Sequence, residues 1–172
     1  MKSKMWPKRT HRLIGMTAAL LACAVLPLLA AWKVGEKLPA LTGYGLAGRV
    51  PATADRVVLL DFWASWCGPC KRSFPELDQL NQSYRSRGLV VCAVSVDDKA
   101  DDMDAFLKDH PVSFSVVRDA EQKLVAAAGV ESMPTSFLVD RHGVIRFSHV
   151  GFRGAETVEQ LKREIEKLLA EK

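Results

Sequence analysis

The chain reads Asp61-Phe62-Trp63-Ala64-Ser65-Trp66-Cys67-Gly68-Pro69-Cys70 where a predicted strand passes into a predicted helix. The apolar run 57–60 precedes this stretch, as in a buried strand, and Pro69 stands where prolines commonly begin helices. The spacing of the two cysteines places one sulfur at the helix N-terminus and the other about one turn inside. The unpaired N–H groups of a helix start favour a thiolate, the reactive form of cysteine. The stretch therefore predicts a site of thiol–disulfide exchange.

A structural disulfide and half of a zinc site are the alternative interpretations of Cys67 and Cys70. A closed zinc site needs four ligands, and the sequence has no second Cys-x-x-Cys or Cys-x-x-His pair. Four cysteines among 172 residues are also too few for a disulfide scaffold. Redox catalysis is therefore favoured. Cys67, at the exposed end, is expected to attack a substrate disulfide, and Cys70, shielded within the helix, to resolve the mixed disulfide.

Asp61 is the predicted general base of this site. It follows the apolar run and precedes Phe62 and Trp63, so burial is favoured over a solvated position at the strand end. Burial raises the pKa of a carboxyl group, which lets it exchange protons near neutral pH and take the proton of Cys70.

The other candidate groups have simpler interpretations. Cys92 lies in a predicted buried strand, which indicates an inert core residue. The histidines at 110, 142 and 149 are scattered without ligand spacing and are predicted to be non-functional. An acidic cluster is similar to a calcium loop but lacks its glycine and closing glutamate, so helix capping and solvation are favoured. Its members are Asp97, Asp98, Asp101, Asp102 and Asp104.

The first 32 residues have the pattern of an export leader. Five basic residues lie between Lys2 and Arg12, no acid precedes Glu36, and the twenty positions from Leu13 to Trp32 carry no charge. This pattern predicts a cleaved signal peptide, a retained membrane anchor or a lipid on Cys23. It also divides the chain into a leader, residues 1–32, and one folded domain, residues 33–172.

The net charge of +4 comes from this leader. Without its five basic residues, 19 of the 24 basic residues remain against 20 acidic ones. A nearly neutral domain gives no electrostatic reason to expect nucleic acid as a partner.

The remainder of the chain alternates between strand and helix patterns. Strands are predicted at 57–63, 89–96, 114–117, 136–140 and 144–150, and helices at 70–87, 101–110, 121–128 and 155–170. Residues 33–51 are rich in glycine and proline, which indicates short extended pieces and turns. This order predicts an α/β fold with a mixed central sheet and helices on both faces.

The pentapeptide Trp66-Cys67-Gly68-Pro69-Cys70 resembles the signature of the thioredoxin superfamily. The longer run 62–70, with Pro75-Glu76-Leu77 after it, is similar to the exported TlpA/ResA branch, and Met133-Pro134-Thr135 resembles the second motif of that branch. The likeness covers about residues 36–170. It implies a thioredoxin fold with a small N-terminal β-hairpin extension, and a cis peptide bond before Pro134 that faces the two cysteines.

The resemblance also implies which residues act. The catalytic residues would be Cys67, Cys70 and Asp61, although Asp61 matches thioredoxin proper, and the TlpA-like branch often has asparagine there. The residues that face the substrate would be Trp66, Gly68, Pro69, Met133 and Pro134. The Gly-Pro pair between the cysteines is similar to that of reducing members. No metal and no cofactor beyond the redox-active disulfide are expected.

The expected function is reduction of protein disulfides by an exported, monomeric oxidoreductase, in the periplasm or at the outer face of the cytoplasmic membrane. The implied substrates are the haem-binding cysteines of apocytochrome c or copper-site cysteines of oxidase assembly proteins. The implied electron donor is a membrane thiol carrier of the DsbD or CcdA type. An oxidising or isomerising role stays open. The competing class is a Sco-like copper-handling protein, but such proteins have three residues between their cysteines, whereas Cys67 and Cys70 have two.

Overall fold

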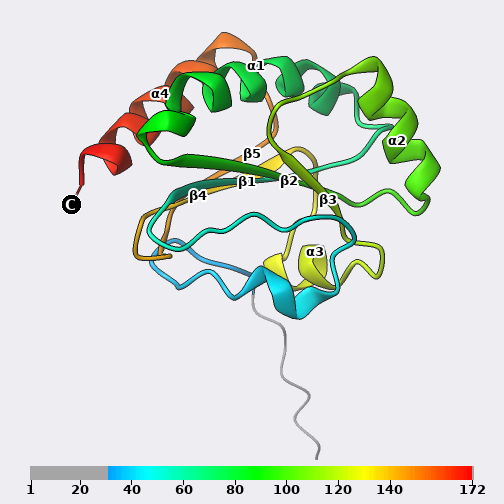
Figure 1. The fold of residues 1–172 in the computed structure, drawn as a ribbon, viewed down its shortest axis with the longest axis horizontal. Coiled ribbons are helices and arrows are strands. Elements are labelled where there is room, and N and C mark those ends of the chain that lie inside the picture. Colours follow the sequence, from blue (N-terminus) through cyan, green and yellow to red (C-terminus); the bar gives the residue numbers. More distant parts are fainter. Residues whose placement is uncertain (1–30, 172) are drawn as a thin grey trace, which may run out of the picture.

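A five-stranded sheet with helices on both faces forms the protein (Figure 1). The structure is a computed structural model that describes residues 31–171. Its elements, in chain order, are η1 (Leu41–Tyr44), β1 (Val57–Trp63), α1 (Gly68–Tyr84), η2 (Arg85–Arg87), β2 (Leu89–Ser95), α2 (Ala100–Asp109), β3 (Ser115–Arg118), α3 (Lys123–Ala128), β4 (Thr135–Val139), β5 (Ile145–Val150) and α4 (Ala155–Ala170).

The sheet is mixed, as the sequence predicts. Its strand order is β3-β2-β1-β4-β5. β1 runs parallel to β2, and β2 runs parallel to β3. β4 is antiparallel to both of its neighbours, β1 and β5. β1 is central and all seven of its residues are buried, which explains why its sequence is an almost unbroken apolar run.

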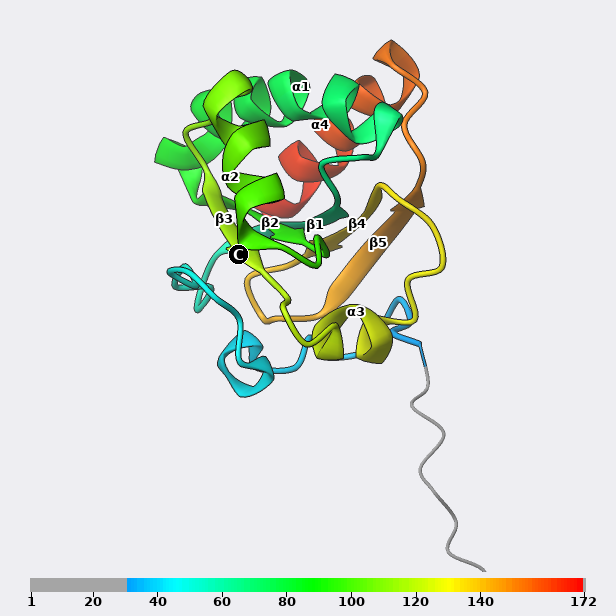
Figure 2. The ribbon, with the colours of Figure 1, turned by 90° about the vertical axis from the view of Figure 1, so that its right-hand side faces the viewer.

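The helices divide unequally between the two faces. α1, α2 and α4 cover one face, and α3 lies on the other together with the segment that precedes β1 (Figures 1 and 2). Phe74 of α1 contacts Phe106 of α2, with ring centroids 5.1 Å apart. Tyr84 of α1 donates a hydrogen bond from its hydroxyl group to Glu166 Oε1 of α4 at 2.8 Å. α1 is therefore in contact with both of the other helices on its face.

Predicted and observed elements agree closely. Most boundaries lie within two residues of the predictions, and the predicted helix 70–87 is divided into α1 and the short turn η2. One side of α4 is apolar and faces the core: Val158, Leu161, Ile165 and Leu168 are buried, and Leu169 is half-buried. α3 ends at Gly129, whose φ of 66° lies in the left-handed region that favours glycine at a helix end.

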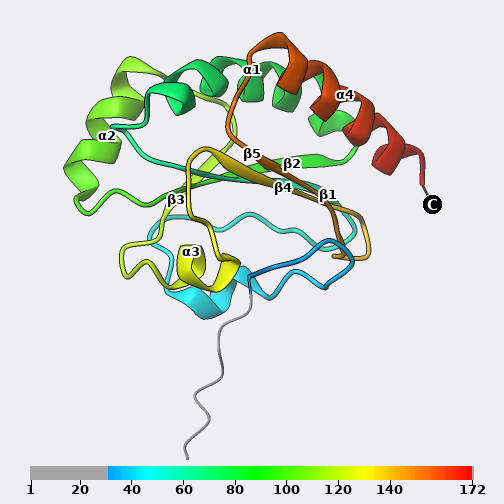
Figure 3. The same ribbon diagram turned by 180° about the vertical axis from the view of Figure 1, so that it is seen from behind.

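Residues 31–56 form an extended strap beneath the sheet, on the face that carries α3 (Figure 3). The N-terminal hairpin expected over 33–51 is not seen among the described residues. Instead, Lys37 bridges to Val144, just before β5, and Ala47 bridges to Arg118 of β3. Since β5 and β3 are the two edges of the sheet, the strap pairs with opposite edges and not with itself.

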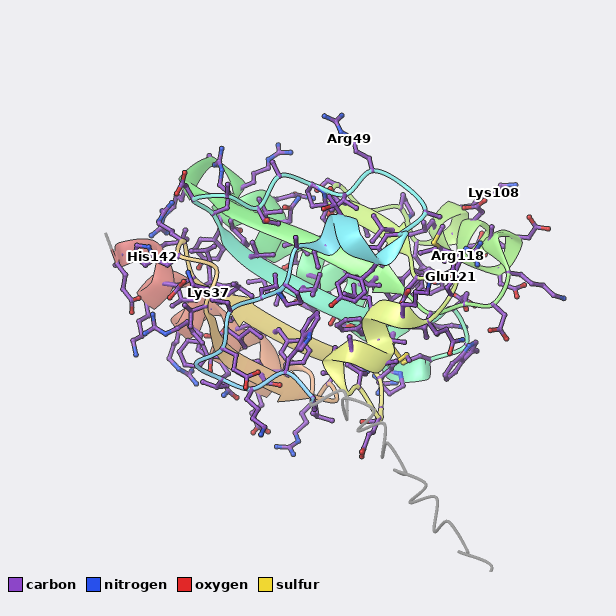
Figure 4. The ribbon with its side chains drawn as sticks, turned by 90° about the horizontal axis from the view of Figure 1, so that it is seen from below. Lys37, Arg49, Lys108, Arg118, Glu121 and His142 are labelled. Carbon is purple, nitrogen blue, oxygen red and sulfur yellow. A yellow bond between two sulfur atoms is a disulfide. The ribbon has the colours of Figure 1, made fainter. Side chains whose placement is uncertain are left out.

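The side chains confirm this placement of the strap. Viewed from below, Lys37 and His142 lie together at one side of the molecule, and Arg118 lies far from them at the other side (Figure 4). The Lys37 ammonium group donates a hydrogen bond to the His142 carbonyl oxygen.

No helix within residues 31–171 is long and apolar enough to cross a membrane. Residues 1–30 of the predicted leader, which spans 1–32, lie outside the described residues. Trp32, at its end, contacts the core: its ring centroid is 5.4 Å from that of Phe137 and 6.2 Å from that of Phe62.

Candidate active site

Cys67 and Cys70 form a disulfide at the start of α1, with their Cα atoms 5.2 Å apart. Cys67 is the N-cap residue of the helix, and its sulfur accepts a hydrogen bond from the backbone N–H of Cys70 at 3.2 Å. Pro69 occupies the first turn of the helix, where its missing N–H costs nothing. Cys70 is fully buried, whereas Cys67 keeps 5 % of its surface exposed. Of the two sulfurs, only that of Cys67 belongs to a residue with any exposed surface.

Asp61 points from β1 toward the face of the sheet that α1 covers. Trp63, two residues later on the same strand, packs its ring against Phe74 of α1 at 4.4 Å between centroids, and alternate strand residues share a face. The predicted burial of Asp61 is confirmed, because only 1 % of its surface is exposed.

The surroundings of Asp61 favour its protonated form. Ser136 donates a hydrogen bond from Oγ to Asp61 Oδ1 at 2.6 Å, and Oδ2 has no hydrogen-bond partner. Burial raises the pKa of Asp61 to about 7, although the hydrogen bond from Ser136 opposes the shift. This carboxyl group can therefore gain and lose a proton near neutral pH.

The peptide bond between Met133 and Pro134 is cis, as expected. The Pro134 carbonyl oxygen accepts a hydrogen bond from Gly151 N–H at 2.7 Å, which attaches this loop to the end of β5. Thr135 begins β4 and pairs with Phe62 near the end of β1. The cis-proline loop and the cysteine pair therefore lie at the same end of the sheet.

The surface around the pair is open and partly apolar. Trp66 is 70 % exposed, and a Cβ atom added to the exposed Gly68 would meet nothing within 4 Å. Met133 is half-buried, and Val150, which pairs with Thr135, is 64 % exposed. The sequence singled out Trp66 and Met133 but not Val150, because its exposure depends on the strand pairing beside the cis-proline loop.

Asp97 corrects one prediction. The sequence predicts capping and solvation for Asp97, as for the other acids of its cluster, but only 2 % of its surface is exposed. Its carboxylate accepts hydrogen bonds from Ser65 N–H at 3.1 Å, from Ser65 Oγ at 2.8 Å and from Ser95 Oγ at 2.8 Å. Since Ser65 lies just before Trp66 and Cys67, Asp97 fixes the loop that leads into the cysteine pair.

The pairing of β2 with β1 explains this role of Asp97. Ser95 ends the apolar run of β2 and pairs with Trp63, which places the next residues beside the active-site loop. The remaining acids of the cluster are exposed as predicted: Asp98, Asp101, Asp102 and Asp104.

The remaining candidates lie apart from the cysteine pair. Cys92 is fully buried and unpaired, and burial raises the pKa of its thiol to about 12, as an inert core residue requires. The His110 ring lies against Phe106 at 4.5 Å between centroids, and His149 Nε2 lies 2.6 Å from Glu164 Oε2. Within residues 31–171, no group of three or more histidine, cysteine or acidic side chains is arranged to hold a metal ion.

A redox-active disulfide at a helix start, beside a buried carboxyl group and a cis-proline loop, defines a thiol–disulfide oxidoreductase with a thioredoxin fold. The sequence model described as Redoxin matches residues 33–165. The chain therefore belongs to the Redoxin family, within the thioredoxin superfamily.

Named relatives agree with this assignment. The thiol-disulfide oxidoreductase ResA of Geobacillus thermodenitrificans is 30 % identical over 138 residues, which cover 78 % of each chain. Among solved structures, a Chlorobium tepidum protein described as a thiol:disulfide interchange protein DsbE has 39 % identity and a TM-score of 0.75, over 81 % of this chain and all of that one. StoA of Bacillus subtilis has 27 % identity and a TM-score of 0.57, over 64 % of this chain and 82 % of that one.

Proposed function

We propose that this protein reduces disulfide bonds in exported protein substrates through Cys67 and Cys70. The observation that carries the proposal is the disulfide at the start of α1, on the side of the sheet to which Asp61 points. The Gly-Pro pair between the cysteines, which resembles that of reducing members, favours reduction over oxidation.

Cys67 is the proposed attacking residue. After reduction, the helix start and the N–H group of Cys70 stabilise a thiolate at Cys67, because both place partial positive charge beside the sulfur. This thiolate attacks a substrate disulfide and forms a mixed disulfide. Cys70, which is fully buried, then attacks the Cys67 sulfur and releases the reduced substrate.

Asp61 is the proposed base for the second step. A thiol must lose its proton before it attacks, and the burial of Cys70 opposes that loss. A carboxyl group with a pKa of about 7 is partly ionised at neutral pH and can accept this proton. The helix start already favours the Cys67 thiolate, so the first step depends less on Asp61.

The proposed substrate is an extended peptide that lies across the cysteine pair and the cis-proline loop. The backbone of Met133 would pair with the peptide, as in the addition of a strand to a sheet edge. The flexible Met133 side chain and the exposed ring of Trp66 would contact its apolar residues. Gly68 would leave the approach to the sulfurs open, because it carries no side chain there. Pro69 would border this approach, and the cis bond before Pro134 would turn the Met133 backbone toward the peptide.

The location and partners belong to the same proposal. The basic and apolar halves of residues 1–32 support export, with a signal peptide, an anchor or a lipid at Cys23. The domain that follows would then act in the periplasm or at the outer face of the cytoplasmic membrane. Apocytochrome c or the copper-site proteins of oxidase assembly would supply the disulfides, and a membrane carrier of the DsbD or CcdA type the electrons.

Insulin reduction tests this function. Cys67→Ser should abolish turnover, and Cys70→Ser should accumulate a covalent mixed disulfide that a thiol reductant releases. Cys92→Ser is the matched control, because this buried thiol plays no part in the proposed reaction. Faster alkylation of Cys70 than of Cys67 in the reduced, folded protein would show that the two roles are reversed.

A further inference from the structure

A row of polar side chains crosses the sheet from Asp61 to the edge strand β5. In the register of the sheet, Asp61 of β1 pairs with Ser136 of β4, and Ser136 pairs with His149 of β5. Side chains of residues directly opposite each other point to the same face, so all three lie on the side of α1 and α4. The parallel row two residues away on this face is apolar and consists of Leu59, Leu138 and Phe147.

Hydrogen bonds occur at both ends of the polar row. At its inner end, Ser136 Oγ donates to Asp61 Oδ1 at 2.6 Å. At its outer end, His149 Nε2 lies 2.6 Å from Glu164 Oε2 of α4, and Gln160 donates to Glu164 Oε1 at 3.1 Å. Between the ends, no hydrogen bond joins the described side chains of Ser136 and His149. Cross-strand partners of this kind have Cβ atoms about 5 Å apart, a span that one bridging water covers.

Exposure increases along the row. Asp61 is 1 % exposed and Ser136 is 8 % exposed, while the side chains of His149 and Glu164 are 11 % and 12 % exposed. The fully buried Cys70 offers no alternative contact with solvent. Asp61 must nevertheless gain and release a proton in each turnover if it serves as a base. The row leads from this carboxyl group to two side chains that are partly exposed.

The groups that face Asp61 limit what else could set its protonation. α1, which covers this face of the sheet, carries Cys70, whose sulfur is held in the disulfide. β2 contributes Ala93, which does not titrate. β4 contributes the Ser136 hydroxyl group, and beyond it the row continues to the His149–Glu164 pair.

We propose that Ser136 and the His149–Glu164 pair are positioning residues that carry protons between Asp61 and solvent while the mixed disulfide is resolved. This inference rests on the proposed reductase function. A hydroxyl group both donates and accepts, and the two ring nitrogens of imidazole can donate on one side and accept on the other, so each member of the row can pass a proton onward.

The proposed step balances in protons and electrons. Asp61 carboxylate takes the proton of the Cys70 thiol, and the thiolate attacks the Cys67 sulfur. The bond between Cys67 and the substrate breaks, and the substrate sulfur leaves as a thiolate that takes a proton from water. Two electrons pass from the protein dithiol to the substrate disulfide over the whole cycle. Asp61 then releases its proton through Ser136 and one bridging water to His149, which returns it to solvent beside Glu164.

A purely structural role is the alternative, because the His149–Glu164 pair also joins α4 to β5. Tyr84→Phe provides the matched control. It removes the hydrogen bond between Tyr84 and Glu166, which joins α4 to α1 at 2.8 Å and lies outside the row. A variant that only loosens α4 should therefore behave like Tyr84→Phe.

Single-turnover reduction of a fluorescent peptide disulfide, measured from pH 6 to 8.5, tests the proposal. His149→Gln should slow the Cys70-dependent step about tenfold and leave formation of the mixed disulfide unchanged. Glu164→Gln, which keeps a hydrogen-bonding partner for His149, should slow the same step. Ser136→Ala should slow this step as well, because it removes a member of the row, and should move its pH midpoint upward by about one unit, because a hydrogen bond to the ionised carboxyl group is lost. Tyr84→Phe should change neither rate.

Equal rates and pH profiles for His149→Gln and Tyr84→Phe would overturn the proposal. Titration of the Asp61 carboxyl carbon by NMR in the oxidised protein provides a readout that does not depend on turnover. Its midpoint should shift in Ser136→Ala and in His149→Gln, and unchanged midpoints in both would also overturn the proposal. The two proposals can fail separately. If the parent protein reduces no disulfide, the reductase function is wrong. If the titration midpoints of Asp61 still shift in the two variants, the connection of Asp61 to the row stands.

Discussion

Asp61 makes the stability of the folded protein depend on pH. Its pKa is about 7 in the folded state because of burial, whereas an aspartate in the unfolded chain titrates near its ordinary value of about 4. Between these values the folded protein retains a proton that the unfolded chain has released. Stability therefore falls as the pH rises through this window, and above pH 7 the loss is constant at about 4 kcal/mol.

Asp61→Asn should remove this dependence. The variant cannot ionise, so its gain in the free energy of unfolding over the parent should be about 2 to 3 kcal/mol larger at pH 8 than at pH 5. Urea denaturation of the two oxidised proteins at both pH values measures the difference. A difference that is the same at pH 5 and pH 8 would mean that Asp61 titrates as a solvated carboxyl group.

Asp97 acts at the same scale, through the loop that carries Trp66 and Cys67. Asp97→Asn replaces one accepting oxygen by an amide group, which leaves Ser65 or Ser95 without its acceptor. The free energy of unfolding should fall by about 1 to 3 kcal/mol, and the alkylation rate of reduced Cys67 should change because the loop is no longer fixed.

Asp98→Asn is the control for Asp97, since it changes a neighbouring acid that is exposed. Its effect on stability should stay within about 0.5 kcal/mol. If the two variants lose equal stability and leave Cys67 equally reactive, the hydrogen bonds of Asp97 do not position the loop.

At the scale of elements, the local parts of the site could be predicted from the sequence. Cys67 and Cys70 occupy a helix start that follows a buried strand, and both features depend on residues close in sequence. The lateral neighbours could not be predicted in this way. Ser136 lies opposite Asp61 because of the register in which β4 pairs with β1. The apolar sequence of β1 does not show which strands pair with it or in which register. The burial of Asp97 escaped prediction for the same reason, because Ser65 is 32 positions away.

α2 has one fully packed anchor in the core, and its half-buried Met103 and Leu107 add to it. Phe106 is its one buried residue, and its ring contacts Trp63 at 4.7 Å and Phe74 at 5.1 Å between centroids. Phe106→Ala should cost about 3 to 5 kcal/mol, whereas Phe106→Leu should cost less because it leaves a smaller cavity.

Hydrogen exchange distinguishes a local from a global effect of Phe106→Ala. In the variant, the amides of α2 should exchange faster than the loss of global stability alone would predict. Those of β1 should lose only as much protection as the global stability falls. Equal loss of protection in α2 and β1, with no separate opening of the helix, would show that other contacts hold α2 in place.

The strap is the part of the whole molecule that the sequence predicted least well. Its glycines and prolines indicated turns, and this was correct, but turns do not reveal which strands the segment meets. The expectation of an N-terminal hairpin rested on the family resemblance alone. In the structure, Ala47 exchanges two backbone hydrogen bonds with Arg118, both at 2.8 Å, and so covers the outer edge of β3. Covered edges prevent a sheet from pairing with other chains.

The strap should therefore keep the molecule monomeric as well as stable. A chain that begins at residue 52 lacks the partner of the β3 edge and exposes the ring of Phe137, against which Trp32 packs at 5.4 Å. It should associate or aggregate at concentrations at which a chain that begins at residue 31 remains monomeric by light scattering. Trp32→Ala within the longer chain should lower the free energy of unfolding by about 1 to 3 kcal/mol and leave it monomeric, because the edge stays covered. A monomeric short chain of unchanged stability would show that the strap neither protects the sheet nor supports the fold.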